Sequence, residues 1–174
     1  MRKLKNEELN RPSLEDYKTQ RKNDVVIILD NIRSLNNVGS AFRTSDAFNI
    51  EKIFLCGITG TPPHRDIHKT ALGATDSVAW EHVQSTENLI KRLKGENYQV
   101  YAIEQTEGAI MLDQFVPNKG DKYCFVFGNE VFGVSQEAID ACNECLEIPQ
   151  YGTKHSLNIS VCIGVVLWDF LSKN

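Results

Sequence analysis

Apolar and polar residues alternate along the chain in a way that predicts buried strands joined by helices. The run from Val25 to Leu29 is continuous and β-branched, which is typical of a strand buried on both faces. Four other segments rich in apolar residues predict further strands, at 52–56, 98–103, 123–127 and 145–148. Helices are predicted between and after them, at 39–48, 85–93, 135–141 and 159–171. Strands that alternate with helices predict the α/β class, with a mainly parallel sheet and helices on both faces.

Length and charge divide the chain into two unequal parts. With 174 residues and 41% hydrophobic composition, it suits one globular domain, which we place at residues 25–174. Residues 1–24 form a polar extension, predicted to be partly helical, with seven Lys or Arg against five acidic residues. The formal net charge of the whole chain is −4, which argues against nucleic-acid binding through bulk positive charge. The basic extension indicates a polyanion partner, and an ordinary solvated helix explains it equally well.

Cysteine usage and the lack of long apolar runs predict a cytoplasmic protein. No early segment resembles a signal peptide, and no apolar run is long enough to span a membrane. The five cysteines are an odd number, which favours reduced thiols. Cys142 and Cys145 form a single CxxC without the second pair that a zinc ribbon needs, so no metal site is expected. Cys124 and Cys162 are predicted to lie in the core.

Three polar loops follow predicted strands, at 30–37, 128–133 and 149–158. The carboxyl ends of parallel strands meet at one edge of a sheet, and ligands bind in the crevice beyond that edge. We therefore expect the three loops to form one site.

The first loop is predicted to bind a phosphate or a ribose. Gly39 and Ser40 are expected to begin a helix whose free amides face an anion. Asn37 would lie just before that helix and Arg43 about one turn inside it, so that both side chains point to one spot. A capped helix with an arginine salt bridge is the alternative interpretation, and the spacing does not separate the two.

The other two loops carry further polar groups. Gly128 would allow a ligand close to the backbone, and Glu130 would hold a hydroxyl or a cationic donor. Ser156 and Asn158 are expected near a helix start, in a loop suited to wrap an adenine or a ribose. The alternatives are a glycine turn with an exposed glutamate and a long polar connection.

Several well-known chemical motifs are absent from the sequence. There is no GxGxxG after the first strand, no GxxxxGK[ST] and no GxSxG. These absences count against a nucleotide-binding dehydrogenase or hydrolase, which is the rival enzyme class. His64 and His68 lack the nearby glutamate of a zinc protease and are expected to form a basic helical face with Arg65 and Lys69.

The three loops, in this order, resemble the three motifs of the SpoU (TrmH) branch of the SPOUT methyltransferases. The similar segments are 36–44, 127–133 and 148–160, and the resemblance covers about residues 24 to 172. It implies an α/β fold with a carboxyl-terminal trefoil knot, which breaks the usual rule against knots. It also implies a homodimer with each site near the subunit interface, and S-adenosylmethionine as the methyl donor. The implied products are 2′-O-methylated nucleotides of tRNA or rRNA.

The resemblance also implies roles for individual residues. The donor would be held largely by main chain near Ile103, Glu104, Gly128, Ile148, Ser156, Leu157 and Asn158. Arg43 would activate the ribose hydroxyl. Because arginine is normally fully protonated, an equally good role is to hold a substrate phosphate. The residues expected to complete the catalytic site are Asn37, Glu130, Ser156 and Asn158. The expected RNA contacts are Arg33, Arg43, Arg65, Lys69 and the extension at 1–24.

The RNA substrate is less well defined than the reaction. We favour tRNA, because the chain has little room for an added RNA-binding domain. The alternatives are the same reaction on rRNA and a non-catalytic RNA-binding or assembly factor on the same fold.

Overall fold

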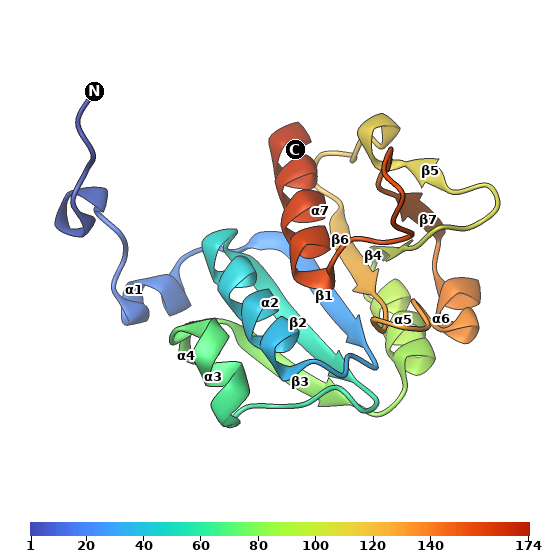
Figure 1. The fold of residues 1–174 in the computed structure, drawn as a ribbon, viewed down its shortest axis with the longest axis horizontal. Helices are drawn as coiled ribbons and strands as arrows, with labels where there is room; N and C mark the ends of the chain where they lie inside the picture. The colour runs from blue at the N-terminus through green and yellow to red at the C-terminus, as the bar shows by residue number, and fades with distance from the viewer.

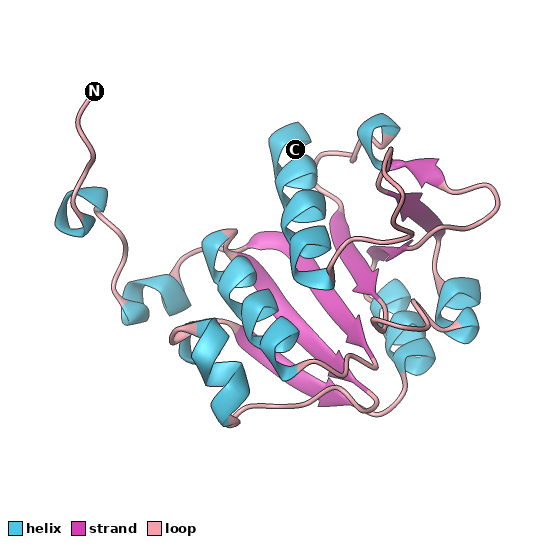
Figure 2. Cartoon of the chain, viewed as in Figure 1, coloured by secondary structure: helices cyan, strands magenta, loops and turns pink.

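The computed structural model describes the backbone of residues 1–174 and every side chain except that of Asn6. Its centre is a seven-stranded sheet in the order β3-β2-β1-β6-β4-β7-β5, in which every neighbouring pair is parallel (Figure 2). The strands are β1 (Asn23–Asp30), β2 (Ile50–Cys56), β3 (Ala79–Val83), β4 (Tyr98–Ile103), β5 (Ile110–Met111), β6 (Lys122–Phe127) and β7 (Glu144–Glu147). The predicted α/β class with a parallel sheet is confirmed.

Helices cover both faces of this sheet (Figure 1). The helices are α1 (Leu14–Thr19), α2 (Leu35–Ala47), α3 (Arg65–Ala71), α4 (Ala74–Ser77), α5 (Thr86–Gly95), α6 (Gln136–Ala141) and α7 (Ile159–Lys173), with short 3₁₀ helices η1 (Asn6–Leu9) and η2 (Leu112–Gln114). On one face α2 packs beside α7 and against α3, whereas α5 packs with α6 on the other. No helix among residues 1–174 is long and apolar enough to cross a membrane.

Strand β1, the third of the seven in the sheet, contributes side chains to two hydrophobic cores. Val25, Ile27 and Leu29 pack in the core beneath α2, α3 and α7. Val26 and Ile28 face the opposite core, beneath α5 and α6. Each of these side chains is at most 1% exposed, and such burial contributes roughly 1.5–3 kcal/mol for each residue. This double burial explains the continuous apolar run from which the strand was predicted.

The register of the sheet aligns the strand ends that carry the polar loops. Leu29 pairs with Phe127, Phe127 with Ile103, and Ile103 with Leu146. The residues that follow these positions therefore come out at one edge of the sheet, as the sequence predicted. The three polar loops meet there.

One helix begins four residues earlier than predicted, and this changes the first loop. Helix α2 starts at Leu35, because the Ser34 hydroxyl accepts the amide of Asn37 at 3.3 Å and caps the helix. Gly39 thus lies inside the helix, and the prediction that Gly39 and Ser40 offer free amides to an anion is wrong. A Cβ at Gly39 would lie 2.1 Å from Thr70 Oγ1 and 2.3 Å from the Ile67 carbonyl, so the glycine allows α2 to pack closely on α3.

Two strands were not predicted at all. Strand β3 lies at the edge of the sheet and has the pattern of a half-exposed strand, with Trp80, Glu81 and His82 in its middle. Strand β5 has only two residues and forms the opposite edge. Neither carries the apolar run that marks the inner strands.

In Figure 1 the amino-terminal extension begins apart from the sheet and runs towards β1 through α1. It contacts the domain through α1, where Tyr17 is 7% exposed and its hydroxyl donates to the Asp46 carbonyl at 3.0 Å. Gln20 and Lys22 add contacts, since both side chains donate to Asn49 Oδ1. The Lys22 ammonium lies 3.2 Å from the centroid of the Tyr17 ring.

Candidate functional site

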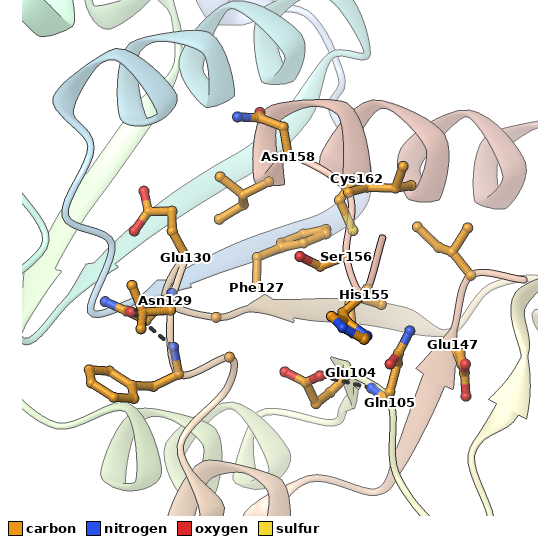
Figure 3. Close-up of a pocket in the computed structure, with 18 of the residues that line it drawn as sticks. Glu104, Gln105, Phe127, Asn129, Glu130, Glu147, His155, Ser156, Asn158 and Cys162 are labelled. Carbon is orange, nitrogen blue, oxygen red and sulfur yellow. Dashed lines mark hydrogen bonds between the residues drawn. The ribbon is translucent and has the colours of Figure 1, made fainter. Parts of the chain in front are cut away.

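A cavity of about 570 Å³ opens beyond the carboxyl ends of β4, β6 and β7 (Figure 3). Its volume is in the range of small-molecule and cofactor sites. It is lined by Ile103, Glu104, Gln105, Phe127, Gly128, Asn129, Glu130, Val131, Phe132, Gly133, Glu147, Ile148, Gln150, His155, Ser156, Leu157, Asn158, Ile159 and Cys162. In Figure 3, Asn129 and Glu130 lie at one end of the pocket, and Gln105 and Glu147 lie at the other.

Eight of the residues predicted for the site line this one cavity. They are Ile103, Glu104, Gly128, Glu130, Ile148, Ser156, Leu157 and Asn158. They come from the ends of three neighbouring strands and from the connection to α7. The second and third polar loops therefore share one pocket.

Glu130 ties the second loop to the first. Its carboxylate accepts the amides of Arg33 at 3.1 Å and Ser34 at 3.0 Å, and the Asn37 Nδ2 group at 3.0 Å. The two backbone amides lie directly before α2, so the carboxylate sits at the N-terminal end of the helix, where a negative charge is favoured. Burial opposes ionisation of Glu130, but these hydrogen bonds outweigh it and hold the pKa of the carboxyl below its ordinary value.

Asn37 and Asn158 extend this link to the third loop. The Asn158 Nδ2 group donates to Asn37 Oδ1 at 3.4 Å. Asn158 also caps α7, because its Oδ1 accepts the amide of Ser160 at 2.9 Å. Asn37 does not line the cavity, yet it lies between two residues that do. The three polar loops are therefore joined by side-chain hydrogen bonds.

Glu104 forms a hydrogen bond with the residue that follows the second loop. Its two carboxylate oxygens accept the amides of Gln105 and Val134, each at 2.9 Å. Gly133 adopts φ +70°, and a Cβ there would lie 2.2 Å from Glu104 Oε2. The glycine lets this carboxylate approach the turn closely.

Gly128 is required by the fold of the turn in which it lies. A Cβ at Gly128 would lie 2.1 Å from both the Gly133 carbonyl carbon and the Val134 nitrogen. The glycine therefore allows the turn to fold back on itself. Gly128 also lines the cavity, and the close approach of a ligand to its backbone stays a prediction.

Arg43 lies outside the cavity. It is exposed on α2, and among the described residues its guanidinium has no hydrogen-bond or ion-pair partner within the chain. Asn37 and Arg43 are six residues apart in the same helix, which turns their directions about 120° from each other. The prediction that both point to one spot is therefore wrong within one subunit. The cause is the early start of α2, which places both residues in the helix.

The predicted phosphate contacts are exposed cations on or beside α2 and α3. Arg33 precedes α2, and Arg65 and Lys69 lie one turn apart on α3, which packs against α2. Within the described part of the chain, none of the three forms an ion pair. Their charges are available to a partner.

The cavity itself is acidic. Its lining includes Glu104, Glu130 and Glu147, and neither lysine nor arginine lines it. Cys162, which was predicted to be core, is half-buried and lines the pocket. Burial raises the pKa of its thiol to about 12, so the thiol stays protonated at neutral pH and is not a nucleophile. The charge of the lining favours a ligand that carries positive charge.

Sequence reasoning missed several residues of the pocket wall. Gln105, Asn129 and Glu147 each lie within two residues of a strand end that was predicted, so their position along the strands was the available signal. His155 and Gln150 lie in the third loop, which was recognised as a whole. No group of three or more metal-binding side chains occurs among the described residues.

Comparison with known proteins identifies related sequences over most of this chain. The model of the SpoU rRNA Methylase family matches residues 24–168. The 23S rRNA (guanosine-2′-O-)-methyltransferase RlmB of Neisseria meningitidis is 29% identical over 143 residues, which are 82% of this chain and 56% of that protein. The tRNA (guanosine(18)-2′-O)-methyltransferase of Aquifex aeolicus is 26% identical over 160 residues, 90% of this chain and 72% of that protein. The chain thus spans little more than half the length of the rRNA relative.

Solved structures share the same fold. The TrmH/SpoU tRNA modifying enzyme of A. aeolicus matches with a TM-score of 0.79 and 24% identity, over 90% of this chain and 78% of that one. The AdoMet-bound rRNA methyltransferase of Sinorhizobium meliloti matches with a TM-score of 0.79 and 25% identity, over 91% of this chain and 59% of that one.

Proposed function

The chain belongs to the SpoU rRNA Methylase family, and from this premise we propose that it is an S-adenosylmethionine-dependent methyltransferase that acts on a ribose 2′-hydroxyl of RNA. The observation that carries the proposal is the cavity at the strand ends, which eight residues expected from the family resemblance line together. Relatives named as 2′-O-methyltransferases of tRNA and of rRNA support the same reaction.

The chemistry of the pocket fits the proposed donor. S-adenosylmethionine, when bound, supplies a methyl group on a positively charged sulfonium. Glu104, Glu130 and Glu147 give the lining a negative charge that suits such a cation. The same charge disfavours a nucleotide whose phosphates would face these carboxylates, such as ATP or NAD.

We assign the donor to the backbone around the cavity. The segments that would hold it are 103–104, 128, 148 and 156–158, all of which line the pocket. Residues 155–158 are exposed and line the pocket, so their backbone borders the proposed donor site. The cap at Asn158 fixes where this segment ends, because it holds the first turn of α7.

The catalytic residues that we propose are Arg43, Asn37, Glu130, Ser156 and Asn158. Methyl transfer to a hydroxyl needs alignment of the reacting atoms and removal of a proton. Glu130 and Asn158 fix Asn37 between them and so hold the polar end of the pocket in place. Arg43, exposed on α2, is proposed to hold a substrate phosphate or to activate the hydroxyl from outside the donor pocket.

A homodimer would let Arg43, which lies outside the cavity of its own subunit, take part in a site at the subunit interface. Helix α7 exposes Val161, Val165 and Trp168, which are 52%, 38% and 67% exposed and share one face at helical spacing. A second copy is our proposed cover for this apolar face. Because α2 packs beside α7, a copy seated there would also lie beside Arg43.

We further propose that the carboxyl-terminal segment is threaded as the trefoil knot of SPOUT proteins. Strand β7 lies between β4 and β5, both of which precede it in the sequence. The segment from β7 to α7 therefore enters a position already flanked by earlier strands, which supports the threading.

The proposed RNA contacts lie outside the cavity. Arg33, Arg65, Lys69 and the extension at residues 1–24, which we treat as separate from the domain at 25–174, would bind phosphates. We propose tRNA as the substrate, with rRNA as the alternative, since relatives named for both RNAs match the chain. The five free cysteines fit a cytoplasmic location for this reaction.

Two measurements, made one after the other, test the proposal. Calorimetry with S-adenosylmethionine, NAD and ATP should give binding of the first alone. Transfer of a tritiated methyl group to separate tRNA and rRNA pools should then label one pool, and nuclease digestion should yield a 2′-O-methylated nucleoside. Donor binding without transfer to any RNA would favour the non-catalytic factor, and absence of donor binding would overturn the proposal.

A further inference from the structure

Asp30 is a buried carboxylate that contacts the residue next to the cavity-lining turn and has no role in the proposed mechanism. It ends β1 and is 1% exposed. Its Oδ1 atom accepts from the Thr86 hydroxyl at 2.5 Å and from Asn31 Nδ2 at 3.0 Å. Its Oδ2 atom accepts from the Ser135 amide at 3.0 Å and the Ser135 hydroxyl at 2.9 Å. A buried carboxylate is tolerated only when it is satisfied in this way.

The Ser135 contacts hold one end of the turn that forms the second polar loop. Ser135 follows directly after residues 128–134, most of which line the cavity. The other end of the turn is held by the neighbour of Asp30, because the Asn31 carbonyl accepts Asn129 Nδ2 at 2.6 Å. Two consecutive residues at the end of β1 thus hold both ends of the turn.

The turn between these two points is closed on itself. The amide of Asn129 donates to the Gly133 carbonyl, and the amide of Gly133 donates back to Asn129, both at 2.9 Å. Because the turn is a closed unit, its position follows the points that hold it. That position sets where Gly128 and the Glu130 carboxylate stand in the pocket wall.

We propose that Asp30 is a positioning residue that acts through Ser135 to place the turn at residues 128–134 for donor binding. The inference rests on the proposed function for its ligand, but the contact between Asp30 and the turn does not. Asp30 itself lines no part of the cavity, so it touches neither the donor nor the substrate.

The two hydroxyls on Asp30 provide a matched pair of variants. Ser135→Ala removes a donor on the side of the turn, and Thr86→Val removes a donor on the side of α5. Both changes take one hydrogen bond from the same carboxylate, so a purely structural role predicts similar effects. A positioning role predicts that only the change at Ser135 reaches the pocket.

The experiment combines hydrogen exchange of the peptide at 128–134 with calorimetry of S-adenosylmethionine binding to the full chain. Ser135→Ala is expected to speed exchange of the turn amides and to weaken donor binding, each by about tenfold, since a lost hydrogen bond to a charged group has this effect on an equilibrium. Thr86→Val should leave both quantities within about twofold of the wild type, because the lost hydrogen bond lies on the side of α5 and the turn keeps its own contacts.

A conservative change at Asp30 itself separates positioning from folding. Asp30→Asn keeps one oxygen for the Ser135 amide and hydroxyl, and its new amide can donate to the Thr86 hydroxyl. The change gives up the hydrogen bond from Asn31 Nδ2, which is not a bond to the turn. Donor affinity in this variant should stay within about threefold of the wild type, whereas Asp30→Ala should lose more than Ser135→Ala.

Equal effects of the two hydroxyl variants, or unchanged exchange of the turn in Ser135→Ala, would overturn the positioning role. Faster exchange confined to the turn would support the role of Asp30 even if the wild-type chain bound no S-adenosylmethionine. In that case it is the proposed function that fails, because the exchange measurement needs no ligand.

Discussion

The Nδ2 group of Asn37 lies 3.0 Å from the carboxylate of Glu130, which is 93 residues further along the chain. This hydrogen bond joins the start of α2 to the turn after β6. It makes Glu130 part of the helix start, where the carboxylate also accepts two backbone amides. Glu130 is therefore expected to act first on the shape of the site and only through it on the reaction.

Glu130→Gln should destabilise the fold by about 1 kcal/mol, because an amide oxygen replaces a charged acceptor at the start of a helix. Urea unfolding at neutral pH measures this loss. The control is Glu107→Gln, an exposed carboxyl that accepts no hydrogen bond within the described part of the chain. Equal stability of the two variants would contradict the role of Glu130 in holding the residues at and just before the start of α2.

The contribution of Glu130 should depend on pH in a defined direction. Its pKa is lower in the folded protein than the ordinary value of 4.5, so its ionised form stabilises the fold. That contribution is present above pH 4.5 and is lost as the pH falls through the lower folded-state pKa. The stability gap between wild type and Glu130→Gln should therefore narrow below pH 4.5. A gap that stays constant down to pH 3 would argue against the lowered pKa.

Gly128→Ala should distort the turn and weaken donor binding by at least about tenfold, because the new methyl group meets backbone that cannot move freely. The contacts are with Gly133 and Val134, each at 2.1 Å. The matched control is Gly152→Ala in the third loop, where an added Cβ meets nothing within 4 Å. Calorimetry with S-adenosylmethionine compares the two, and loss of binding in both would point to a general sensitivity of the loops.

Arg43→Ala should abolish methyl transfer while leaving the fold and the donor pocket intact. Arg43 is exposed and lines no part of the cavity, so stability should change by less than about 0.5 kcal/mol. The rate of transfer should fall at least ~100-fold. Donor affinity by calorimetry is the internal control, and a parallel loss of donor affinity would place Arg43 in the donor site instead.

The exposed cations near α2 and α3 should carry the salt dependence of RNA binding. Neutralising Arg33, Arg65 and Lys69 together is expected to reduce the slope of log affinity against log salt by roughly 2–3, since each phosphate contact contributes about 0.7–0.9. Filter binding at several salt concentrations measures this slope. An unchanged slope would remove these residues from the RNA surface.

Trp168→Glu should convert the proposed dimer to a monomer, because a charge would be buried in the apolar face of α7. Ile58→Glu is the control, since Ile58 is 68% exposed and lies in the loop after β2. Sedimentation at micromolar concentration separates the two states. Methyl transfer should fall with the dimer if Arg43 serves a site completed by the second copy.

The inner strands and the meeting of the three loops were predictable because their signals are local. The apolar run at 25–29 marks a strand whatever surrounds it, and parallel pairing then places its end beside the end of β6. The start of α2 was not predictable from Gly39. That glycine is required by the close packing of α2 on Thr70, which is 31 residues away in the sequence.

The arrangement around Asp30 was hidden for a similar reason. Its partners Thr86 and Ser135 lie 56 and 105 residues further along the sequence, and neither stands in a recognisable pattern with it. Ser135 was correctly predicted to begin a helix, yet its hydroxyl serves Asp30 and does not cap α6. A buried carboxylate with distant partners has no local signature.

The order of the strands has a consequence for how the chain is made. Strand β1 can pair with β2 soon after synthesis, but its other neighbour is β6, which begins at Lys122. A nascent chain therefore presents the open edge of this largely apolar strand for about a hundred residues of elongation, which takes roughly 5–20 s at typical translation rates. Such long-range parallel pairing is slow and open to aggregation. Folding on the ribosome should accordingly depend on cover for that edge.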